Sequence, residues 1–437
     1  MIFLVLAAEN VLFPVVGLAV VLKFALSRRR ALLRGLLAEL PERLGFVPMP
    51  ALAALKGREV IWVHAASAGE VSAVSEFVRR LKSSAKNPPA VVMTCSTAAG
   101  RERARSLSAV DAALLAPLDI YSAVSRFLMQ IKPKILLIAE TELWPHMIAL
   151  SARRGVKIAV VNGRISKRSF ARTRLFTFLT RPFLAKVGRV AAQSEEHAAR
   201  FEALGAPAER VRALGNLKYD VTPAAGPVEA AAKAVADLGW EGAPLFVAGS
   251  THPAEEDVVL KAYAAAQERV PALKLVLAPR HVERAHEAAR NLERRRIACC
   301  AWSKPGRPAN SSALLLDAMG ILPAFYGRAL LSFVGGTLVP VGGHNILEPA
   351  LAGSPVAFGP YTAHVEDVAR ALEEAGGGFK VRDAGELALK LQSLAALPEK
   401  ARAAAEAAKG AAASLQGAVE RTLDDLKDWL IPGARHV

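Results

Sequence analysis

The sequence predicts an α/β protein built from two successive doubly wound parallel sheets. From Glu59 onward, short and nearly continuous apolar runs alternate with segments of helical spacing, which is typical of buried parallel strands joined by helices. The pattern stops at residues 221–227, which are rich in proline and alanine, and then restarts. At 437 residues the chain is also too long for one ordinary core and suits two domains of roughly 200 residues each.

The apolar runs of the first half are expected to form strands. They are Val60 to Ala66, Ala90 to Cys95, Ala112 to Ala116, Ile135 to Ala139, Val156 to Val161, Gly188 to Gln193 and Arg210 to Leu214. Each run is short and is flanked by polar residues or glycine, as buried strands are. The stretches between them, such as 71–81 and 121–131, have the spacing of amphipathic helices.

The second half repeats this organisation after a linker at 221–227. Strands are expected at Leu245 to Ala248, Leu273 to Leu277, Ala313 to Leu316, Ala329 to Val334 and Pro355 to Phe358. From Ala384 to Ile431 the chain is rich in alanine, leucine, glutamate and lysine and should form terminal helices. We therefore divide the chain into residues 1–30, 31–220 and 221–437, and expect the two sheets to face each other across a cleft.

Composition indicates a reducing compartment and an anionic partner. The three cysteines, Cys95, Cys299 and Cys300, give no disulfide framework, and the adjacent pair lacks zinc-ligand spacing. The net charge of +16 and the pI near 10 favour a membrane surface, a phosphorylated substrate or a nucleic acid. Nucleic acid is the weakest of these, because the basic residues are spread along the chain and no nucleic-acid-binding module is recognisable.

An apolar stretch near the N-terminus predicts membrane attachment. Ile2 to Leu22 is apolar except for Glu9 and Asn10, and Arg28-Arg29-Arg30 follows. About 20 apolar residues can span a bilayer, and an arginine cluster keeps the following domain cytoplasmic. Glu9, Asn10 and Pro14 weaken a span, so an anchor lying in the membrane plane is the alternative. No cleaved signal peptide is expected, because no positive residue precedes the apolar run.

The segment from Phe333 to Ala350 has the pattern of a phosphate or nucleotide site. An apolar run ends in one glycine pair, a second pair follows, and a helix-like segment opens at Asn345. The glycines are Gly335, Gly336, Gly342 and Gly343. They let the backbone approach a ligand closely, and Asn345 and Glu348 share a helix face from which they could hold ribose hydroxyls. Asn-x-x-Glu is also a capping box, which is the structural alternative.

A second candidate site follows the first strand, in His64-Ala-Ala-Ser67-Ala-Gly69-Glu70. The small residues leave space at the sheet edge where open α/β folds bind ligands. The following helix favours the ionised form of Glu70, which suits a general base. Ser67-x-x-Glu70 is also a capping box, so capping alone is the alternative. His64 either contacts a substrate or is a hydrogen-bonded structural residue.

Other strand ends of the first domain carry charge. Glu140 and Glu142 directly follow an apolar run, where two carboxylates need partners or a function. Arg164, in a loop with Lys167 and Arg168, belongs either to a solvated basic segment or to a receptor for phosphates or a sugar acid.

Polar residues also gather around the start of the second domain. Lys218 precedes the linker and should lie near the cleft, Ser250 ends the first strand, and Pro279 and Arg280 end the next. Because a guanidinium binds oxyanions bidentately, Arg280 is a candidate phosphate ligand. Their common position at strand ends is a stronger signal than any one of them.

Taken together, these residues resemble the Kdo transferase family, whose members transfer 3-deoxy-D-manno-octulosonic acid (Kdo) to lipid A precursors. The resemblance runs from the apolar N-terminus to about Gly359. It rests on ordered motifs: Glu42-Arg-Leu-Gly45, His64-Ala-Ala-Ser-Ala-Gly-Glu70, Glu140-Thr-Glu-Leu-Trp-Pro145, Asn162-Gly-Arg-Ile-Ser166, Gly215-Asn-Leu-Lys218, Ser250-Thr-His252, Pro279-Arg-His281 and Gly342-Gly-His-Asn-Ile-Leu-Glu348.

The resemblance implies a GT-B glycosyltransferase: two Rossmann-like domains with the active site between them. It implies CMP-Kdo as donor, a lipid A precursor as acceptor, and an inverting reaction without metal or cofactor, in which Glu70 is the general base. Residues assigned to the CMP donor are Lys218, Ser250, Pro279, Arg280, Gly336, Gly342, Gly343, Asn345 and Glu348. Residues assigned to the acceptor or a supporting role are His64, Ser67, Gly69, Glu140, Glu142 and Arg164.

Domain roles and location follow from the same resemblance. Residues 1–30 would be the membrane anchor, 31–220 the acceptor-binding domain and 221–437 the CMP-Kdo-binding domain with its terminal helices. The enzyme would lie at the cytoplasmic face of the inner membrane, with an anionic membrane surface as partner and no nucleic acid.

The chain departs from the family pattern at His146, Ile321, Thr337 and the Ala363-His364 pair. These positions skirt the donor pocket and leave Glu70, Asn345 and Glu348 intact. Two other classes remain open: a GT-B enzyme that uses another nucleotide sugar, and a catalytically degenerate member that only binds lipid or partners.

Overall fold

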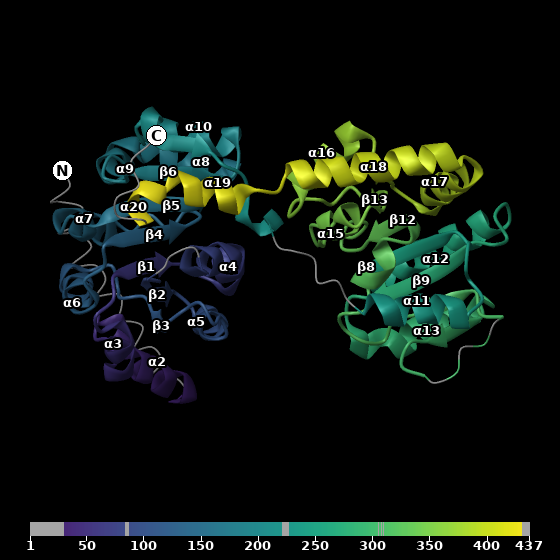
Figure 1. The fold of residues 1–437 in the computed structure, drawn as a ribbon, viewed down its shortest axis with the longest axis horizontal. Coiled ribbons are helices and arrows are strands. Elements are labelled where there is room, and N and C mark those ends of the chain that lie inside the picture. Colours follow the sequence, from purple (N-terminus) through teal and green to yellow (C-terminus); the bar gives the residue numbers. More distant parts are fainter. Residues whose placement is uncertain are drawn as a thin grey trace. The chain divides into compact units, whose positions relative to one another are not determined.

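The chain folds into two compact units, each built around one parallel sheet (Figure 1). The computed structural model describes residues 30–83, 87–220, 227–304, 306, 308 and 310–430. The first unit contains residues up to 221 together with 416–437, and the second contains 222–415. Two parallel α/β sheets of Rossmann-like architecture confirm the predicted fold class.

Residues 1–29 of the predicted membrane anchor (1–30) and residues 221–226 of the predicted linker (221–227) lie outside the described residues. None of the helices within the described ranges combines the length and the apolar character that a bilayer crossing needs.

The seven-stranded sheet of the first unit has the order β3-β2-β1-β4-β5-β6-β7. Its strands are β1 (Val60–His64), β2 (Ala90–Cys95), β3 (Ala112–Leu115), β4 (Ile135–Ala139), β5 (Lys157–Gly163), β6 (Arg189–Ala192) and β7 (Val211–Ala213). The order reverses between β1 and β4. Open α/β sheets bind ligands outside the carboxyl ends of the strands at such a point, so this edge positions the candidate site.

The seven-stranded sheet of the second unit has the order β10-β11-β9-β8-β12-β13-β14 and reverses between β8 and β12. Its strands are β8 (Leu245–Thr251), β9 (Lys274–Pro279), β10 (Cys299–Ala301), β11 (Ala313–Leu315), β12 (Ala329–Val334), β13 (Val356–Phe358) and β14 (Gly378–Lys380). Every predicted strand is present. The edge strands β10 and β14 were not predicted, because three residues with mixed exposure give no clear apolar run.

Helices connect the strands of both sheets. In the first unit they are α2 (Arg30–Arg43), α3 (Met49–Leu55), α4 (Ala68–Ser83), α5 (Ala98–Arg105), α6 (Tyr121–Ile131), α7 (Pro145–Arg153), α8 (Lys167–Thr173), η1 (Arg174–Phe176), α9 (Thr177–Leu184), α10 (Glu195–Ala203), η2 (Ala208–Arg210) and η3 (Leu217–Asp220). In the second they are α11 (Val228–Asp237), α12 (Pro253–Gln267), η4 (Val282–Arg284), α13 (Ala285–Arg294), α14 (Pro323–Tyr326), α15 (Leu347–Leu351), α16 (Glu366–Ala375), α17 (Ala384–Ala396) and α18 (Pro398–Ser414).

Both sheets are buried on both faces, which explains the continuous apolar runs. Along β1, Trp62 belongs to the core on one face, with Phe127, whereas Val63 belongs to the core on the other, with Phe77. Along β8, Phe246 and Val247 divide in the same way. This alternation follows from the two-residue period of a strand.

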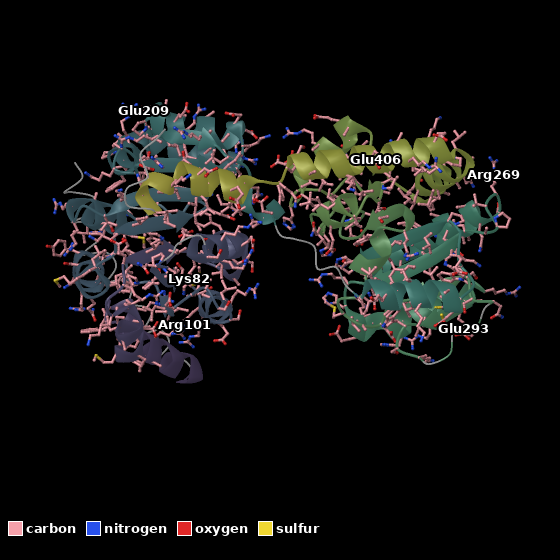
Figure 2. The ribbon with its side chains drawn as sticks, in the orientation of Figure 1. Lys82, Arg101, Glu209, Arg269, Glu293 and Glu406 are labelled. Atoms are coloured by element: carbon pink, nitrogen blue, oxygen red, sulfur yellow. The ribbon has the colours of Figure 1, made fainter. Side chains whose placement is uncertain are left out.

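Glu42 ties the N-terminal helix α2 to the first sheet. One carboxylate oxygen pairs with Arg101 of α5 at 3.1 Å, and the other accepts the backbone N–H of Leu115 at 2.7 Å. Figure 2 labels Arg101 among the side chains of this unit. The Glu42-Arg-Leu-Gly45 motif is therefore explained by packing, since a Cβ on Gly45 would lie only 2.1 Å from the Ala123 carbonyl oxygen.

The terminal helices divide between the units, which corrects the predicted domain limit. α17 and α18 pack in the second unit, but α19 (Ala418–Asp425) and α20 (Lys427–Leu430) belong to the first (Figure 1). Val419 and Leu426 are buried in its core, and Asp220 accepts the backbone N–H of Gly417 at 2.6 Å. Assigning all of 221–437 to one domain was therefore wrong, because the apolar face of α19 completes the first core.

Candidate active site

Glu70 stands at the carboxyl end of β1, in the first turn of α4. One of its carboxylate oxygens accepts the backbone N–H of Ala66 at 2.8 Å, and the other accepts the Ser67 hydroxyl at 3.0 Å. The Glu70 N–H in turn donates to the Ser67 hydroxyl at 3.3 Å. The bond from the Glu70 N–H to Ser67 is one half of the predicted capping box, and the carboxylate returns to the N–H of Ala66, one residue before Ser67. The space expected around it is present, since a Cβ on Gly69 would have its nearest neighbour, the Ser67 hydroxyl, at 3.8 Å.

The surroundings of Glu70 make its carboxylate more basic. Burial raises its pKa, the hydrogen bonds from Ala66 and Ser67 lower it, and the charges of Glu140 and Glu142 raise it further, leaving a net rise. A carboxylate with a raised pKa is a better proton acceptor at neutral pH. Capping and base function are therefore compatible in one side chain.

Glu140 and Glu142 lie near Glu70, after β4. Glu140 has a positive φ of 55° and forms an ion pair with Lys218 at 3.1 Å. Glu142 accepts the Trp144 indole N–H at 2.9 Å, and burial raises its pKa. Lys218, which the sequence assigned to the donor, thus belongs to the first unit and is paired within it.

His64 is buried at the end of β1. It is 0% exposed, and its Nδ1 lies 3.0 Å from the Thr94 hydroxyl, which also accepts the Trp62 indole N–H at 2.8 Å. Burial lowers its pKa to about 4, so the ring is neutral at neutral pH. The Nδ1 contact matches the structural alternative for His64, whereas the buried Nε2 has no hydrogen-bond partner among the described residues.

The pH dependence of stability should report this buried histidine. The fold lowers the pKa of His64 from 6.5, its value in the unfolded chain, to about 4. Its contribution to stability is therefore fully present above pH 6.5 and is lost as the pH falls toward 4. From pH 7 to pH 5, the free energy of unfolding of the wild type, measured with denaturant, should fall by about 2 kcal/mol more than that of His64→Asn. The amide of asparagine can replace the Nδ1 contact of the histidine. His286→Asn, at an exposed site, is the control and should behave as wild type. Equal pH dependence of His64→Asn and wild type would refute this account.

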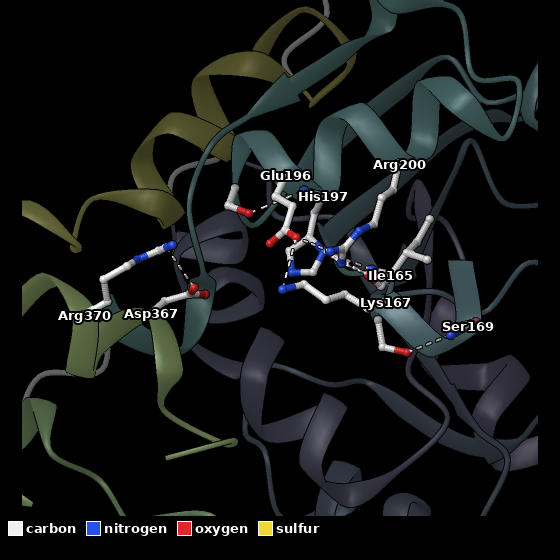
Figure 3. A network of polar contacts seen from close by, with 10 residues as sticks. Ile165, Lys167, Ser169, Glu196, His197, Arg200, Asp367 and Arg370 are labelled. Carbon is white, nitrogen blue, oxygen red and sulfur yellow. Dashed lines mark hydrogen bonds and ion pairs between the residues drawn. The ribbon is translucent and has the colours of Figure 1, made fainter. Parts of the chain in front are cut away.

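The basic loop after β5 is anchored by its backbone and leaves cations exposed. The Arg164 carbonyl accepts the Thr141 hydroxyl, and the Arg164 side chain is exposed. Lys167 is 79% exposed and lies 3.8 Å from Glu196, which also binds Arg200 (Figure 3). Both alternatives for this loop, a solvated segment or an anion receptor, stay open.

The glycine loop of the second unit is organised by Glu255, which is 0% exposed. Its carboxylate accepts four backbone N–H groups, from His252 at 3.0 Å, Gly336 at 2.8 Å, Thr337 at 3.0 Å and Leu338 at 2.8 Å. The N–H of Gly336 is therefore already bonded to an internal carboxylate. The loop resembles an anion-binding turn in which the bound anion is the carboxylate of Glu255.

Close packing explains the glycines of this segment. A Cβ on Gly335 would lie 2.2 Å from the Ser250 carbonyl oxygen, so strand end and loop touch backbone to backbone. Gly336, Gly342 and Gly343 have positive φ values of 73°, 104° and 93°. The predicted positive-φ backbone is present here.

The strand ends of the second unit bring several predicted donor residues together. Ser250 is the second-to-last residue of β8 and has a φ of 54°, and Pro279 is buried at the end of β9. Arg280 follows with an exposed side chain, its backbone N–H bonded to the Thr251 carbonyl at 2.9 Å. The ring of the next residue, His281, lies 6.4 Å from that of His252, which is hydrogen-bonded to His344 of the glycine loop. The positive charge of Arg280 also lowers the pKa of His344.

Asn345 and Glu348 do not form the capping box that the spacing allows. The Asn345 side chain accepts the N–H of Leu347 at 3.1 Å, and the short helix α15 begins only at Leu347. Glu348 is half-buried, burial raises its pKa, and among the described residues its carboxylate has no hydrogen-bond or ion-pair partner. Its charge acts on the buried hydroxyl of Tyr326. Glu348 is thus available to a ligand.

Two features of this site were not assigned from the sequence: Glu255 and the contact between His252 and His344. The motif Pro253-x-Glu255 signals a helix start, but the partners of Glu255 come from residues 336–338. No local spacing could reveal that contact. The two histidines are likewise 92 residues apart in sequence, yet their Nε2 atoms lie 2.9 Å apart.

The departures from the family pattern have structural explanations at two positions. His146 is buried at the start of α7, where Asp119 accepts its backbone N–H at 2.9 Å. Thr337 is buried, and its hydroxyl donates to the Val334 carbonyl at 2.6 Å.

Within the described residues, no group of three or more histidine, cysteine, aspartate or glutamate side chains is placed to hold a metal ion. Independence of metals and cofactors remains a prediction.

Comparison with known proteins first defines the class. The chain matches the structure of UDP-GlcNAc 2-epimerase from Neisseria meningitidis bound to UDP-GlcNAc, with a TM-score of 0.54, 13% identity, and coverage of 85% of this chain and 100% of that one. At this identity the match establishes the fold alone, which is the two-unit GT-B fold predicted above.

Sequence comparison then defines the family. Residues 38–221 match the family model of 3-deoxy-D-manno-octulosonic-acid transferase. The transferase of that name from Haemophilus influenzae is 31% identical over 90% of this chain and 91% of its own length. The one from Bordetella pertussis is 34% identical over 85% and 87%. The chain belongs to the 3-deoxy-D-manno-octulosonic acid transferase family, which confirms the predicted family and its glycosyltransferase class.

Proposed function

We propose that this protein transfers Kdo from CMP-Kdo to a hydroxyl of a lipid A precursor, with inversion at the anomeric carbon and Glu70 as the general base. The observation that supports this best is the position of Glu70. It lies at the switch point of a doubly wound sheet, half-buried, with two further carboxylates raising its pKa. Family membership supports the transfer of Kdo. The lipid A precursor as acceptor is what the resemblance in the sequence implies.

In this mechanism Glu70 removes the proton of the acceptor hydroxyl as its oxygen attacks the anomeric carbon of Kdo. The bond between that carbon and the CMP phosphate oxygen breaks, and CMP leaves with the bonding electron pair. Attack on the face opposite to CMP inverts the configuration. Positive groups near the leaving phosphate stabilise its developing charge.

The residues of the second unit would hold the donor. Glu348 and Asn345 would bind the ribose hydroxyls. Because the N–H groups of residues 336–338 are taken by Glu255, we assign the phosphate to Arg280 and to the polar groups beside it. Lys218, whose ammonium group pairs with Glu140 at 3.1 Å, is a further candidate ligand of the donor.

Membrane location fits an exposed basic and apolar surface over η1 and α9. Leu175, Phe176 and Phe178 are 70%, 53% and 53% exposed. Arg172 and Arg174 lie in the same stretch, which combines the apolar and cationic groups that bind an anionic bilayer surface. We propose that the enzyme works at the cytoplasmic face of the inner membrane, where the acceptor's acyl chains remain in the bilayer.

Replacing Arg280 with alanine should weaken CMP binding. Loss of a charge-assisted contact to phosphate corresponds to a rise in the dissociation constant of roughly 10- to 100-fold, measured by calorimetry. Arg290→Ala removes the same charge from an exposed position on α13 and should leave the constant unchanged. An unchanged constant for Arg280→Ala would remove Arg280 from the donor site.

Nucleotide competition tests the donor itself. The fold is shared with UDP-sugar enzymes, so the alternative is a transferase or epimerase that uses another nucleotide sugar. CMP should displace labelled CMP-Kdo from the purified full-length protein, and UDP at the same concentration should not. Tighter binding of UDP than of CMP would favour the alternative.

A further inference from the structure

His252 and His344 form a direct hydrogen bond at the carboxyl ends of the strands of the second sheet. Their Nε2 atoms lie 2.9 Å apart. The ring planes are only 10° apart and the centroids 5.2 Å apart, which equals the nitrogen separation plus one centroid-to-nitrogen distance in each ring. The rings therefore meet edge to edge in one plane, as an N–H···N bond requires, and are not stacked face to face.

This geometry fixes how many protons the pair can hold. One Nε2 donates and the other must accept with its lone pair. A further proton can enter on Nδ1 of the donating ring, which gives a cation with a charge-assisted bond. Two protonated Nε2 atoms would repel each other and break the bond, so the intact pair takes up one proton and no more.

The charged and titratable groups that face the pair come from the end of β9 and from α12. Arg280 and His281 follow β9, and the His281 ring lies 6.4 Å from that of His252. Glu255 of α12 is bonded to the His252 N–H. Burial lowers the pKa of His344, His252, Arg280 and His281 lower it further, and Glu255 raises it, with a net fall. Without a ligand, these surroundings therefore disfavour a proton on the His344 ring.

We propose that the His252–His344 pair takes up a proton when the phosphate of the donor binds beside Arg280, so that donor binding is coupled to protonation. This inference rests on the proposed function, because it takes CMP as the ligand. An arriving phosphate dianion offsets the positive charge of Arg280 and favours the protonated pair. The pair then supplies a positive charge only while the nucleotide is bound.

Calorimetry can count this proton. At pH 8 the CMP phosphate is already a dianion, so the ligand contributes little to proton uptake. Titrations of the full-length protein with CMP in two buffers of different ionisation enthalpy should show uptake of about one proton per CMP. The dissociation constant should correspondingly rise about tenfold from pH 7.5 to pH 8.5.

Substitutions assign the proton to the pair. His344→Gln keeps a hydrogen-bonding group but cannot be protonated, so CMP should bind without proton uptake and with little pH dependence; His252→Gln should do the same if the first variant fails to fold. His286→Gln, on α13 of the same unit, should keep the wild-type uptake. Uptake that persists in both pair variants, or CMP binding to the wild type without uptake, overturns the inference. Failure of the wild type to bind CMP overturns the proposed donor, and with it this coupling.

Discussion

Replacing Glu70 with glutamine is expected to lower the rate of Kdo transfer by about 10²–10⁴-fold, the usual effect of losing a general base. Glutamine retains the capping contacts: its amide oxygen can accept the Ala66 N–H, and its amide nitrogen can donate to the Ser67 hydroxyl. The fold should therefore survive, and CMP affinity should stay at the wild-type value. Single-turnover transfer measured beside thermal unfolding checks both expectations.

The second unit offers a matched control for capping. Glu386 occupies the same position in α17: its N–H donates to Asp383 at 2.9 Å and its carboxylate accepts the Arg382 N–H at 2.8 Å. Glu386→Gln should change stability by less than the roughly 1 kcal/mol that a lost cap costs and should keep full activity. If Glu70→Gln keeps wild-type turnover as well, Glu70 is not the base.

Replacing Glu255 with alanine should have the largest effect on stability. The change leaves the N–H groups of Gly336 and Thr337 buried without an acceptor, and each unsatisfied buried donor costs about 1–3 kcal/mol. We expect a loss of about 3–5 kcal/mol, which lowers the thermal midpoint of the second unit by roughly 10 °C. Because the loop carries His344, Asn345 and Glu348, CMP binding should weaken at least about tenfold.

Glu256 is the natural control for this variant. It is equally buried, but its carboxylate faces Arg284 at 3.4 Å and not the glycine loop. Glu256→Ala should therefore keep wild-type CMP affinity, whatever it does to stability. CMP affinity of Glu255→Ala is measured by calorimetry at a temperature where the variant is folded. An unchanged affinity would show that the loop does not need the Glu255 carboxylate to bind CMP.

Local patterns were enough to predict most of the fold. Buried parallel strands such as Ile135–Ala139 and Ala329–Val334 show as uninterrupted apolar runs, because both faces of each sheet are covered. Strand ends then revealed Glu70, Glu140 and Arg280, since the carboxyl edge of such a sheet collects ligand residues. These predictions depend only on residues close together in the chain.

Features that depend on distant contacts could not be predicted in this way. The return of α19 to the first unit depends on Asp220 binding residues nearly two hundred positions later. Glu255 was visible only as part of a helix start, although its main partners are residues 336–338. His64 was left open between two roles because burial, which decides its protonation, depends on the packing of the whole sheet.

Transfer itself tests the central claim most directly. The detergent-solubilised full-length protein is incubated with CMP-Kdo and a lipid A precursor, and the mass of the lipid product is determined by mass spectrometry. We expect the lipid to gain the mass of one or more Kdo residues with an equal release of CMP, and Glu70→Gln to give almost none at the same time point. A wild-type protein that binds CMP but leaves the lipid mass unchanged would contradict the assignment.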